Sequence, residues 1–177
     1  MKKLIESVGK IQSFFVLLTV MVLILTHLAL VPPALASRFS VSPVLGSLFS
    51  FSGTPPTNLG VEQGKFAPCP PSPNCVSSQS IDAEHQIEPF SYKDDPETAF
   101  KQIQTILENT ENAAIIKDET NYIYAEFTSP LMGFVDDVEF YLDEQEGLIQ
   151  VRSASRLGES DLGVNRKRIE TIREQFQ

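Results

Sequence analysis

Apolar residues that alternate with polar ones predict five strands in the C-terminal part of the chain. The segment from His85 to Tyr92 predicts a short strand, and Pro89 places it at a sheet edge because proline cannot donate a backbone hydrogen bond. Four further segments have the strand pattern, and they span Ala113–Lys117, Tyr122–Thr128, Val135–Leu142 and Leu148–Ser153. Consecutive strands of this kind are typical of an antiparallel sheet.

Helical periodicity predicts one helix before the last four strands and one after them. The first helix begins at Asp95, which a proline follows directly, and runs to about Asn109. The second helix is capped by Ser160 or Asp161 and runs to Phe176. The order β-α-β-β-β-β-α predicts an α+β fold, with an antiparallel sheet of four to five strands and both helices on one face. The TATA-binding-protein-like (TBP-like) fold has this order and serves as an architectural analogy.

The register of the last two strands follows from burying their alternate apolar residues on one face. Phe140 then opposes Val151, and Glu139 opposes Arg152 on the other face. The residues expected on this outward face are Tyr122, Tyr124, Glu126, Asp137, Glu139, Arg152 and Arg156. Two interpretations stay open, a cross-strand charge ladder or an open polar face that binds a carboxylate, phosphate or sugar.

The first 36 residues have the pattern of an export signal. Three lysines accompany an apolar run from Phe14 to Val31, and two prolines and the tripeptide Ala34-Leu35-Ala36 follow it. A secretory signal cleaved after Ala36 is the favoured interpretation. Because a run of 18 residues reaches the lower limit for a membrane-spanning helix, an uncleaved signal anchor is the alternative. Both interpretations place the remaining chain outside the cytoplasm.

The predicted domain organisation has three parts. Residues 1–36 form the signal peptide or anchor, and residues 37–64 form a flexible tether because they lack sustained periodicity. Residues 65–177 form a single α+β domain. Without the first 36 residues, the chain has 11 Lys and Arg against 22 Asp and Glu. This acidic surface repels nucleic acid and anionic lipid, so contact with a membrane is expected only through an uncleaved N-terminal segment.

Two cysteines, Cys69 and Cys75, bracket five residues of which three are proline. A structural disulfide is the favoured interpretation, because prolines stiffen the turn and an exported compartment permits disulfides. A reactive Cys75 thiol with His85 as its base is one alternative. A metal pair is another, but it needs two further ligands that the sequence does not supply, so no metal or cofactor is expected.

A cluster of cations at residues 166–168 crowds the start of the last helix, where the helix dipole disfavours positive charge. Two sources of negative charge could neutralise these cations. One is a salt-bridge network with carboxylates of the chain, and the other is a small bound anion. The candidate ligand-binding residues are Asp136, Asp137, Glu139, Arg152, Arg156, Asn165 and Arg166. Arg156 and Arg166 are expected to act together on one anion, with Asp136 or Asp137 at the same place.

Three motifs carry a family resemblance. They are APCPPSPNCVSSQS at 67–80, GFVDDVEFYLD at 133–143 and VRSASRLGESDLGVNRKRIE at 151–170. Across about residues 66–176, the chain resembles the domain of unknown function 1499 family. That family is widespread in bacteria and has plastid relatives, so the resemblance implies one fold and an exported setting, the periplasm or the thylakoid lumen. It implies no activity and no catalytic residues.

Two functions stay open. The first is a non-catalytic accessory module that binds a small anion, a polar ligand or a protein of a membrane complex. The second is a hydrolase-like enzyme with Asp136 or Asp137 as base, or with Cys75 as nucleophile. The sequence has no nucleophile elbow, glycine-rich phosphate loop or metal-ligand spacing, so the non-enzymatic function is favoured. Burial of both aspartates in ion pairs would indicate a structural role, whereas an adjoining cleft would indicate a site.

Overall fold

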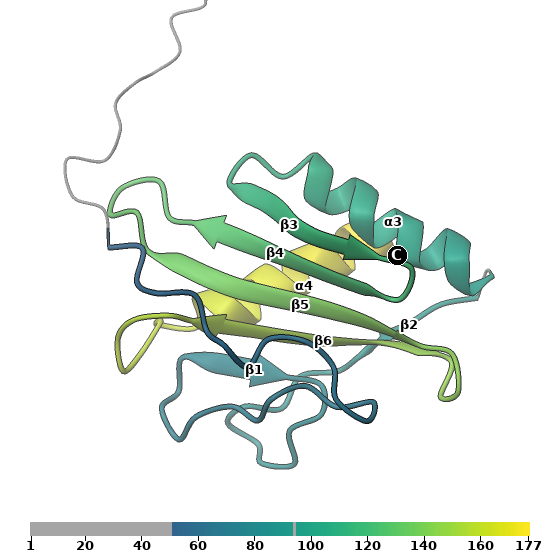
Figure 1. Ribbon diagram of the computed structural model, residues 1–177, viewed down its shortest axis with the longest axis horizontal. Coiled ribbons are helices and arrows are strands. Elements are labelled where there is room, and N and C mark those ends of the chain that lie inside the picture. Colours follow the sequence, from purple (N-terminus) through teal and green to yellow (C-terminus); the bar gives the residue numbers. More distant parts are fainter. Residues whose placement is uncertain (1–50, 94) are drawn as a thin grey trace, which may run out of the picture. The chain divides into compact units, whose positions relative to one another are not determined.

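The structure is a computed structural model that describes residues 51–93 and 95–177 (Figure 1). Its strands are β1 (Cys75–Ser77), β2 (Phe90–Ser91), β3 (Ala113–Glu119), β4 (Tyr122–Thr128), β5 (Val135–Asp143) and β6 (Leu148–Ser155). Its helices are α3 (Pro96–Glu108) and α4 (Val164–Phe176). The predicted signal segment and residues 37–50 of the predicted tether lie outside the described residues.

The strands form one antiparallel sheet in the order β1-β6-β5-β4-β3, and β2 also pairs with β6 (Figure 1). The predicted α+β class and the order of its elements are confirmed. The cysteine loop contributes an additional short strand, β1, so the sheet has six strands. The predicted register is also confirmed, since Phe140 pairs with Val151 and Glu139 with Arg152.

Both helices pack on one face of the sheet (Figure 1). The core between them contains Ile103 of α3, Ile169 of α4 and the inward residues Val138, Phe140 and Val151 of the sheet, all fully buried. Each such side chain contributes roughly 1.5–3 kcal/mol when it leaves water. The period-two alternation of β5 and β6 therefore directs the helix layer to this face.

The two helices begin differently. At α3, the Asp95 carboxylate accepts a hydrogen bond from the Thr98 amide at 3.0 Å, as its predicted capping role requires. At α4, the residue before the helix is Gly163 with φ of 81°, a left-handed conformation that glycine adopts readily. The helix therefore starts at Val164, later than predicted. Asp161 still serves it, because its carboxylate accepts hydrogen bonds from the amides of Gly163 and Asn165.

The opposite face of the sheet is covered by residues 51–68, which we call the strap. Phe66 of the strap is buried with Tyr122 and Tyr124, and Leu59 and Val61 pack against this cluster. The described half of the predicted tether thus lies on the sheet. Within residues 51–93 and 95–177, no helix is long and apolar enough to cross a membrane.

The cysteine loop is closed by the predicted disulfide between Cys69 and Cys75. The loop leads directly into β1, whose Cys75 pairs with Ala154 of β6. The loop also binds α4, because the Asn165 side-chain amide donates to the Asn74 carbonyl oxygen at 2.9 Å. The disulfide thereby holds a turn that joins the edge of the sheet to the last helix.

Candidate functional site

The outward face of β4, β5 and β6 carries the predicted charged residues, and all of them are engaged. The Asp137 carboxylate, only 1% exposed, accepts hydrogen bonds from Arg156 Nε at 3.0 Å and from Arg156 Nη2 at 2.7 Å. The hydrogen bond with Asp137 raises the pKa of the Arg156 guanidinium, although burial opposes this. This pair is a bidentate ion pair of the kind that is strong when desolvated.

Tyrosine and glutamate side chains extend this ion pair across the sheet. The Tyr124 hydroxyl donates to Asp137 Oδ1 at 2.7 Å and also lies 2.9 Å from Glu126. Glu126 in turn forms an ion pair with Arg156. Burial raises the pKa of the Tyr124 phenol, and its hydrogen bonds to Asp137 and Glu126 raise it further. The phenol therefore stays protonated and donates its one proton to the Asp137 carboxylate.

A second ion pair lies further along the same strands. Arg152 Nη1 is 3.2 Å from Glu139 Oε2, and the Glu139 side chain is 0% exposed. Glu139 Oε1 accepts from the Tyr122 hydroxyl at 2.8 Å and from the Gly60 amide of the strap at 2.7 Å. Among described residues, Arg152 Nε is the one buried side-chain nitrogen or oxygen without a hydrogen-bond partner. We call this cross-strand set, Tyr122, Tyr124, Glu126, Asp137, Glu139, Arg152 and Arg156, the buried ladder.

On the helix side of the sheet, Asp136 forms an ion pair with Arg168 of α4. Arg168 Nη1 also donates to Asn165 Oδ1 at 2.6 Å, and its guanidinium lies 4.7 Å from the centre of the Phe127 ring. Of the cations at residues 166–168, Arg168 therefore pairs with a carboxylate, and that carboxylate comes from β5. The sequence suggested Arg166, two positions earlier, as the partner.

The seven candidate ligand-binding residues occupy three places. Asp137, Glu139, Arg152 and Arg156 meet in the buried ladder, on the outward face. Asp136 and Asn165 meet on the helix side through Arg168. Arg166 belongs to neither group, since its guanidinium donates to the carbonyl oxygens of Glu84 and Gln86. Arg156 and Arg166 thus do not share one anion.

The groups proposed for hydrolase chemistry are bound internally. Cys75 is in the disulfide, so it has no thiol to ionise. His85 Nδ1 lies 2.7 Å from Asp82 Oδ1, and its Nε2 lies 3.2 Å from the Ser72 carbonyl oxygen. Burial lowers the pKa of His85, but its hydrogen bonds to Ser72 and Asp82 outweigh burial, so its pKa is raised. Among the described residues, no group of three or more His, Cys, Asp or Glu is arranged to hold a metal ion.

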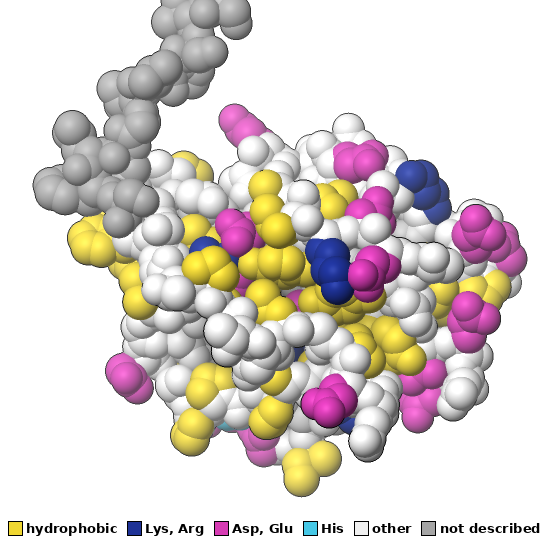
Figure 2. Space-filling view, viewed as in Figure 1, with side chains coloured by type: hydrophobic (Ala, Val, Ile, Leu, Met, Phe, Trp, Pro, Cys, Tyr) yellow, Lys and Arg dark blue, Asp and Glu magenta, His cyan; other side chains and the backbone are white. Residues whose placement is uncertain are grey.

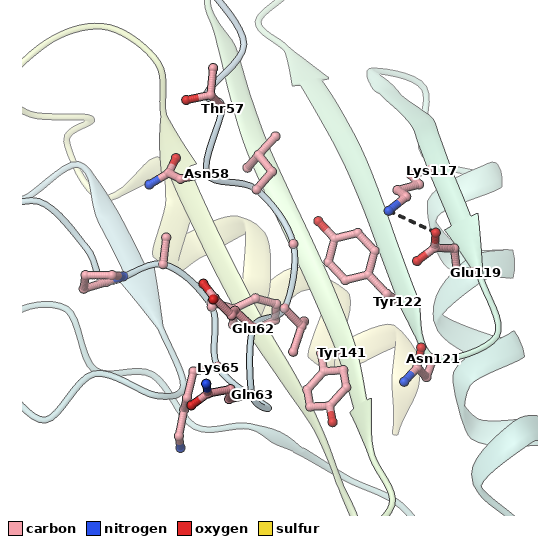
Figure 3. A pocket seen from close by; sticks show the side chains of 16 residues that line it. Thr57, Asn58, Glu62, Gln63, Lys65, Lys117, Glu119, Asn121, Tyr122 and Tyr141 are labelled. Atoms are coloured by element: carbon pink, nitrogen blue, oxygen red, sulfur yellow. Dashed lines mark ion pairs between the residues drawn. The ribbon is translucent and has the colours of Figure 1, made fainter.

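A pocket of about 1070 Å³ lies between the strap and the turn that joins β3 to β4 (Figure 3). We call it the strap pocket. Its labelled polar and aromatic side chains are Thr57, Asn58, Glu62, Gln63 and Lys65 of the strap, Lys117, Glu119, Asn121 and Tyr122 of β3, β4 and their turn, and Tyr141 of β5. Tyr122 belongs to both the pocket and the buried ladder. Of the strap pocket, the sequence pattern indicated only Tyr122.

The charges around the strap pocket balance. Lys117 Nζ is 3.0 Å from Glu119 Oε1 and 5.3 Å from the centre of the Tyr122 ring. Glu62 and Lys65 face each other across a backbone bridge in the strap. Two lysines and two glutamates therefore line the pocket with no excess of either sign. Aromatic rings and side-chain amides supply the rest of its polar wall.

A smaller hollow of about 360 Å³ lies beside α4. Lys167 and Arg168 line it together with Phe127 and Ile172. Arg168 is already held by Asp136 and Asn165, so Lys167 is the cation that this hollow offers to a solute. A single flexible ammonium gives little geometric selectivity.

The fold and these sites define a small α+β domain whose charged sheet face is internal and whose accessible pocket is neutral. The chain belongs to the family described as protein of unknown function DUF1499, whose model matches residues 65–176, more than half of the 177 residues. No curated protein matches the chain. The resemblance carried by the three motifs is thereby confirmed.

Proposed function

We propose that this protein is a non-catalytic binding module whose ligand is a small, neutral, polar molecule held in the strap pocket. The observation that carries this proposal is the division of roles between two neighbouring sites. The carboxylates and arginines of the buried ladder form ion pairs with one another, whereas the adjoining pocket is open, large and balanced in charge. A concave site with aromatic walls and a few polar groups is the usual form of a small-molecule site.

The pocket wall indicates the chemical class of the ligand. The rings of Tyr122 and Tyr141 offer flat apolar surfaces, and the side chains of Asn58, Gln63 and Asn121 can each donate and accept hydrogen bonds. A saccharide or polyol has matching apolar C–H faces and hydroxyl groups. An anion is disfavoured because each lysine of the wall has a glutamate near it in space or sequence.

Hydrolysis has less support than binding. The candidate base Asp137 is clamped by Arg156, and Asp136 by Arg168, so neither carboxylate faces an open cavity as an unpaired group. Cys75 is in the disulfide. A general base needs access to the proton that it removes. No observation on these residues favours the enzymatic alternative.

Ligand binding is tested with the Tyr141→Phe variant, which removes one pocket hydroxyl and keeps the ring. In a thermal-shift panel of monosaccharides, disaccharides, polyols, phosphate and citrate, we expect a saturable shift with a neutral member. Tyr141→Phe should then weaken binding roughly five- to tenfold, the loss of one hydrogen bond of about 1 kcal/mol.

The matched control is Tyr92→Phe, which removes the hydroxyl of another half-buried tyrosine that packs against the hydrophobic core. It should keep the affinity of the natural protein. A shift with citrate or phosphate alone would contradict the neutral-ligand proposal. Equal weakening by both variants would place the ligand outside the strap pocket.

We further propose that the domain works outside the cytoplasm, in the periplasm or thylakoid lumen, either released or tethered to a membrane. The basic and apolar N-terminal pattern supports export, and the Cys69–Cys75 disulfide is in keeping with an oxidising compartment. N-terminal sequencing of protein from the exported fraction is expected to begin at Ser37. An intact N-terminus on membrane-bound protein would establish the anchor instead, and protein found only in the cytoplasm would contradict export.

A further inference from the structure

Exposed apolar side chains gather at one end of the domain, which we call the apolar end. They come from Phe51, from the loop between β4 and β5, and from the segment between β6 and the first turn of α4. The residues are Phe51, Leu131, Met132, Phe134, Leu157, Leu162 and Val164. Leu131 is 82% exposed and Leu162 is 95% exposed. Single exposed apolar residues are ordinary, but a contiguous set marks an interaction surface.

Strand pairing places the loop between β4 and β5 and the segment after β6 at the same end of the sheet, and direct contacts connect the start of the strap with both. Thr128 pairs with Val135 where β4 ends and β5 begins, and Asp136 pairs with Ser155 where β6 ends. The rings of Phe51 and Phe134 stack with centres 5.4 Å apart.

The start of the strap reaches both loops. The Phe51 amide donates to the Met132 carbonyl oxygen at 3.3 Å. A Cβ built on Gly53 would lie 3.1 Å from Leu157 Cγ, so the strap also touches the segment that follows β6. Figure 2 shows hydrophobic side chains at this end of the domain.

Leu162 has an unfavourable backbone conformation. Its φ is 55°, in the left-handed region that an L-residue other than glycine, asparagine or aspartate rarely adopts. Its side chain is nevertheless almost fully exposed, so burial within the domain does not compensate for that conformation. A large apolar side chain held outward on a strained turn suits contact with an apolar phase outside the domain.

The charge of the apolar end selects the kind of surface it contacts. The loop from 129 to 134 contains no charged residue. The segment from 157 to 163 contains Glu159 and Asp161, and the Asp161 carboxylate already accepts two amide hydrogen bonds at the start of α4. The exposed Lys167 lies near Val164 in the first turn of α4 and, among the described residues, is the one cation set against these two carboxylates. The apolar end therefore has no excess of positive charge and lacks the attraction to anionic lipid that basic interfacial segments have.

The course of the chain indicates where this surface lies in relation to a membrane. Fifty residues precede Phe51, and they include the apolar run from Phe14 to Val31. The domain is therefore joined to its predicted membrane or export segment through the apolar end. We propose that the apolar end inserts into the interfacial region of a membrane with neutral headgroups, which would hold the strap pocket beside the bilayer. This proposal does not depend on what the strap pocket binds.

The chain contains no tryptophan, so a single tryptophan reports on its own surroundings. The test uses Leu131→Trp and Leu162→Trp, with Ile81→Trp as the matched control. Ile81 is 99% exposed in the loop after β1, which leaves β6 in the direction away from the apolar end. The full chain is reconstituted into phosphatidylcholine vesicles, or the naturally cleaved chain is mixed with them, with and without bromine on the acyl chains.

We expect the emission of both reporters to shift to the blue with vesicles and to lose most of its intensity when the lipid carries bromine. The Ile81→Trp emission should do neither, even in a chain that is anchored to the same vesicles. Emission of both reporters that stays red and unquenched would overturn the proposal. A blue shift that needs no lipid and ignores bromine would also overturn it, and would indicate a second copy or residues 37–50 as the occupant, according to whether the shift depends on protein concentration.

Discussion

Replacement of Arg156 by methionine is expected to lower the free energy of unfolding by about 3–5 kcal/mol, because it leaves a buried carboxylate without its counter-ion. Asp137 is 1% exposed and accepts hydrogen bonds from two nitrogens of this arginine, and Glu126 loses the same partner. The methionine side chain fills much of the volume but supplies no donor. Urea denaturation of the natural protein and the variant measures the change.

Two further variants separate the loss of an ion pair from the loss of an arginine. Arg166→Met removes a guanidinium that bonds only backbone carbonyl oxygens of the 84–86 loop, and it should cost about 1 kcal/mol or less. The double variant Arg156→Met/Asp137→Asn should be destabilised by less than the sum of its single changes, since the buried charge is gone. If the changes in the free energy of unfolding for Arg156→Met and Asp137→Asn add up to that of the double variant, the two side chains do not stabilise each other. An equal loss for Arg156→Met and Arg166→Met would likewise show that the ion pairs of the buried ladder add no stability beyond that of an exposed arginine.

Replacement of Asn165 by leucine is expected to destabilise the domain by about 2–4 kcal/mol, because it leaves one or two buried polar groups without partners. Asn165 is fully buried at the first turn of α4. Its Oδ1 accepts from the Ser153 hydroxyl and from Arg168, both at 2.6 Å, and its Nδ2 donates to the Asn74 carbonyl oxygen and the Ser155 hydroxyl. Leucine has the same number and branching of side-chain heavy atoms as asparagine and provides none of these bonds.

The control for this prediction is Asn112→Leu, which makes the same change at an exposed position before β3. Its effect should stay within about 0.5 kcal/mol, as is usual for exposed sites. Thermal and urea unfolding of both variants decide the matter. Equal stabilities for the two would mean that the contacts of Asn165 with the cysteine loop and β6 do not hold α4 in place.

The regular strands could be predicted from the sequence, because the position of a residue along a strand determines the face of the sheet on which its side chain lies. In β5 and β6, the alternation of apolar residues determines which side chains face the helices, so the pairing of Phe140 with Val151 followed directly. The pairing of Glu139 with Arg152 then came without further information. The disulfide also followed from local sequence, since the spacing and prolines of its loop suit a closed turn.

The contacts of the strap and of the start of α4 could not be predicted from the sequence, because both depend on irregular backbone. The strap packs through a few scattered side chains and through the Gly60 amide, and neither produces a periodic signal. The sequence left two interpretations of the outward face open, a cross-strand charge ladder and an open polar face, and the strap covers the charged residues as a buried ladder. The strap also forms one wall of a pocket that no sequence motif indicated. The choice of Arg168 over Arg166 has a similar origin, because residues two apart on a helix point in different directions and the start of α4 depends on the conformation of Gly163.

If the predicted membrane segment stays uncleaved, the strap also limits how far the domain can move away from the membrane. The strap, residues 51–68, is part of the folded domain. In an uncleaved chain, only residues 32–50 therefore remain between the predicted membrane segment and the domain. Nineteen fully extended residues reach at most about 65 Å. A domain anchored in this way would stay within that distance of the lipid, so its local concentration there would be high and its ligand would have to be found within that layer.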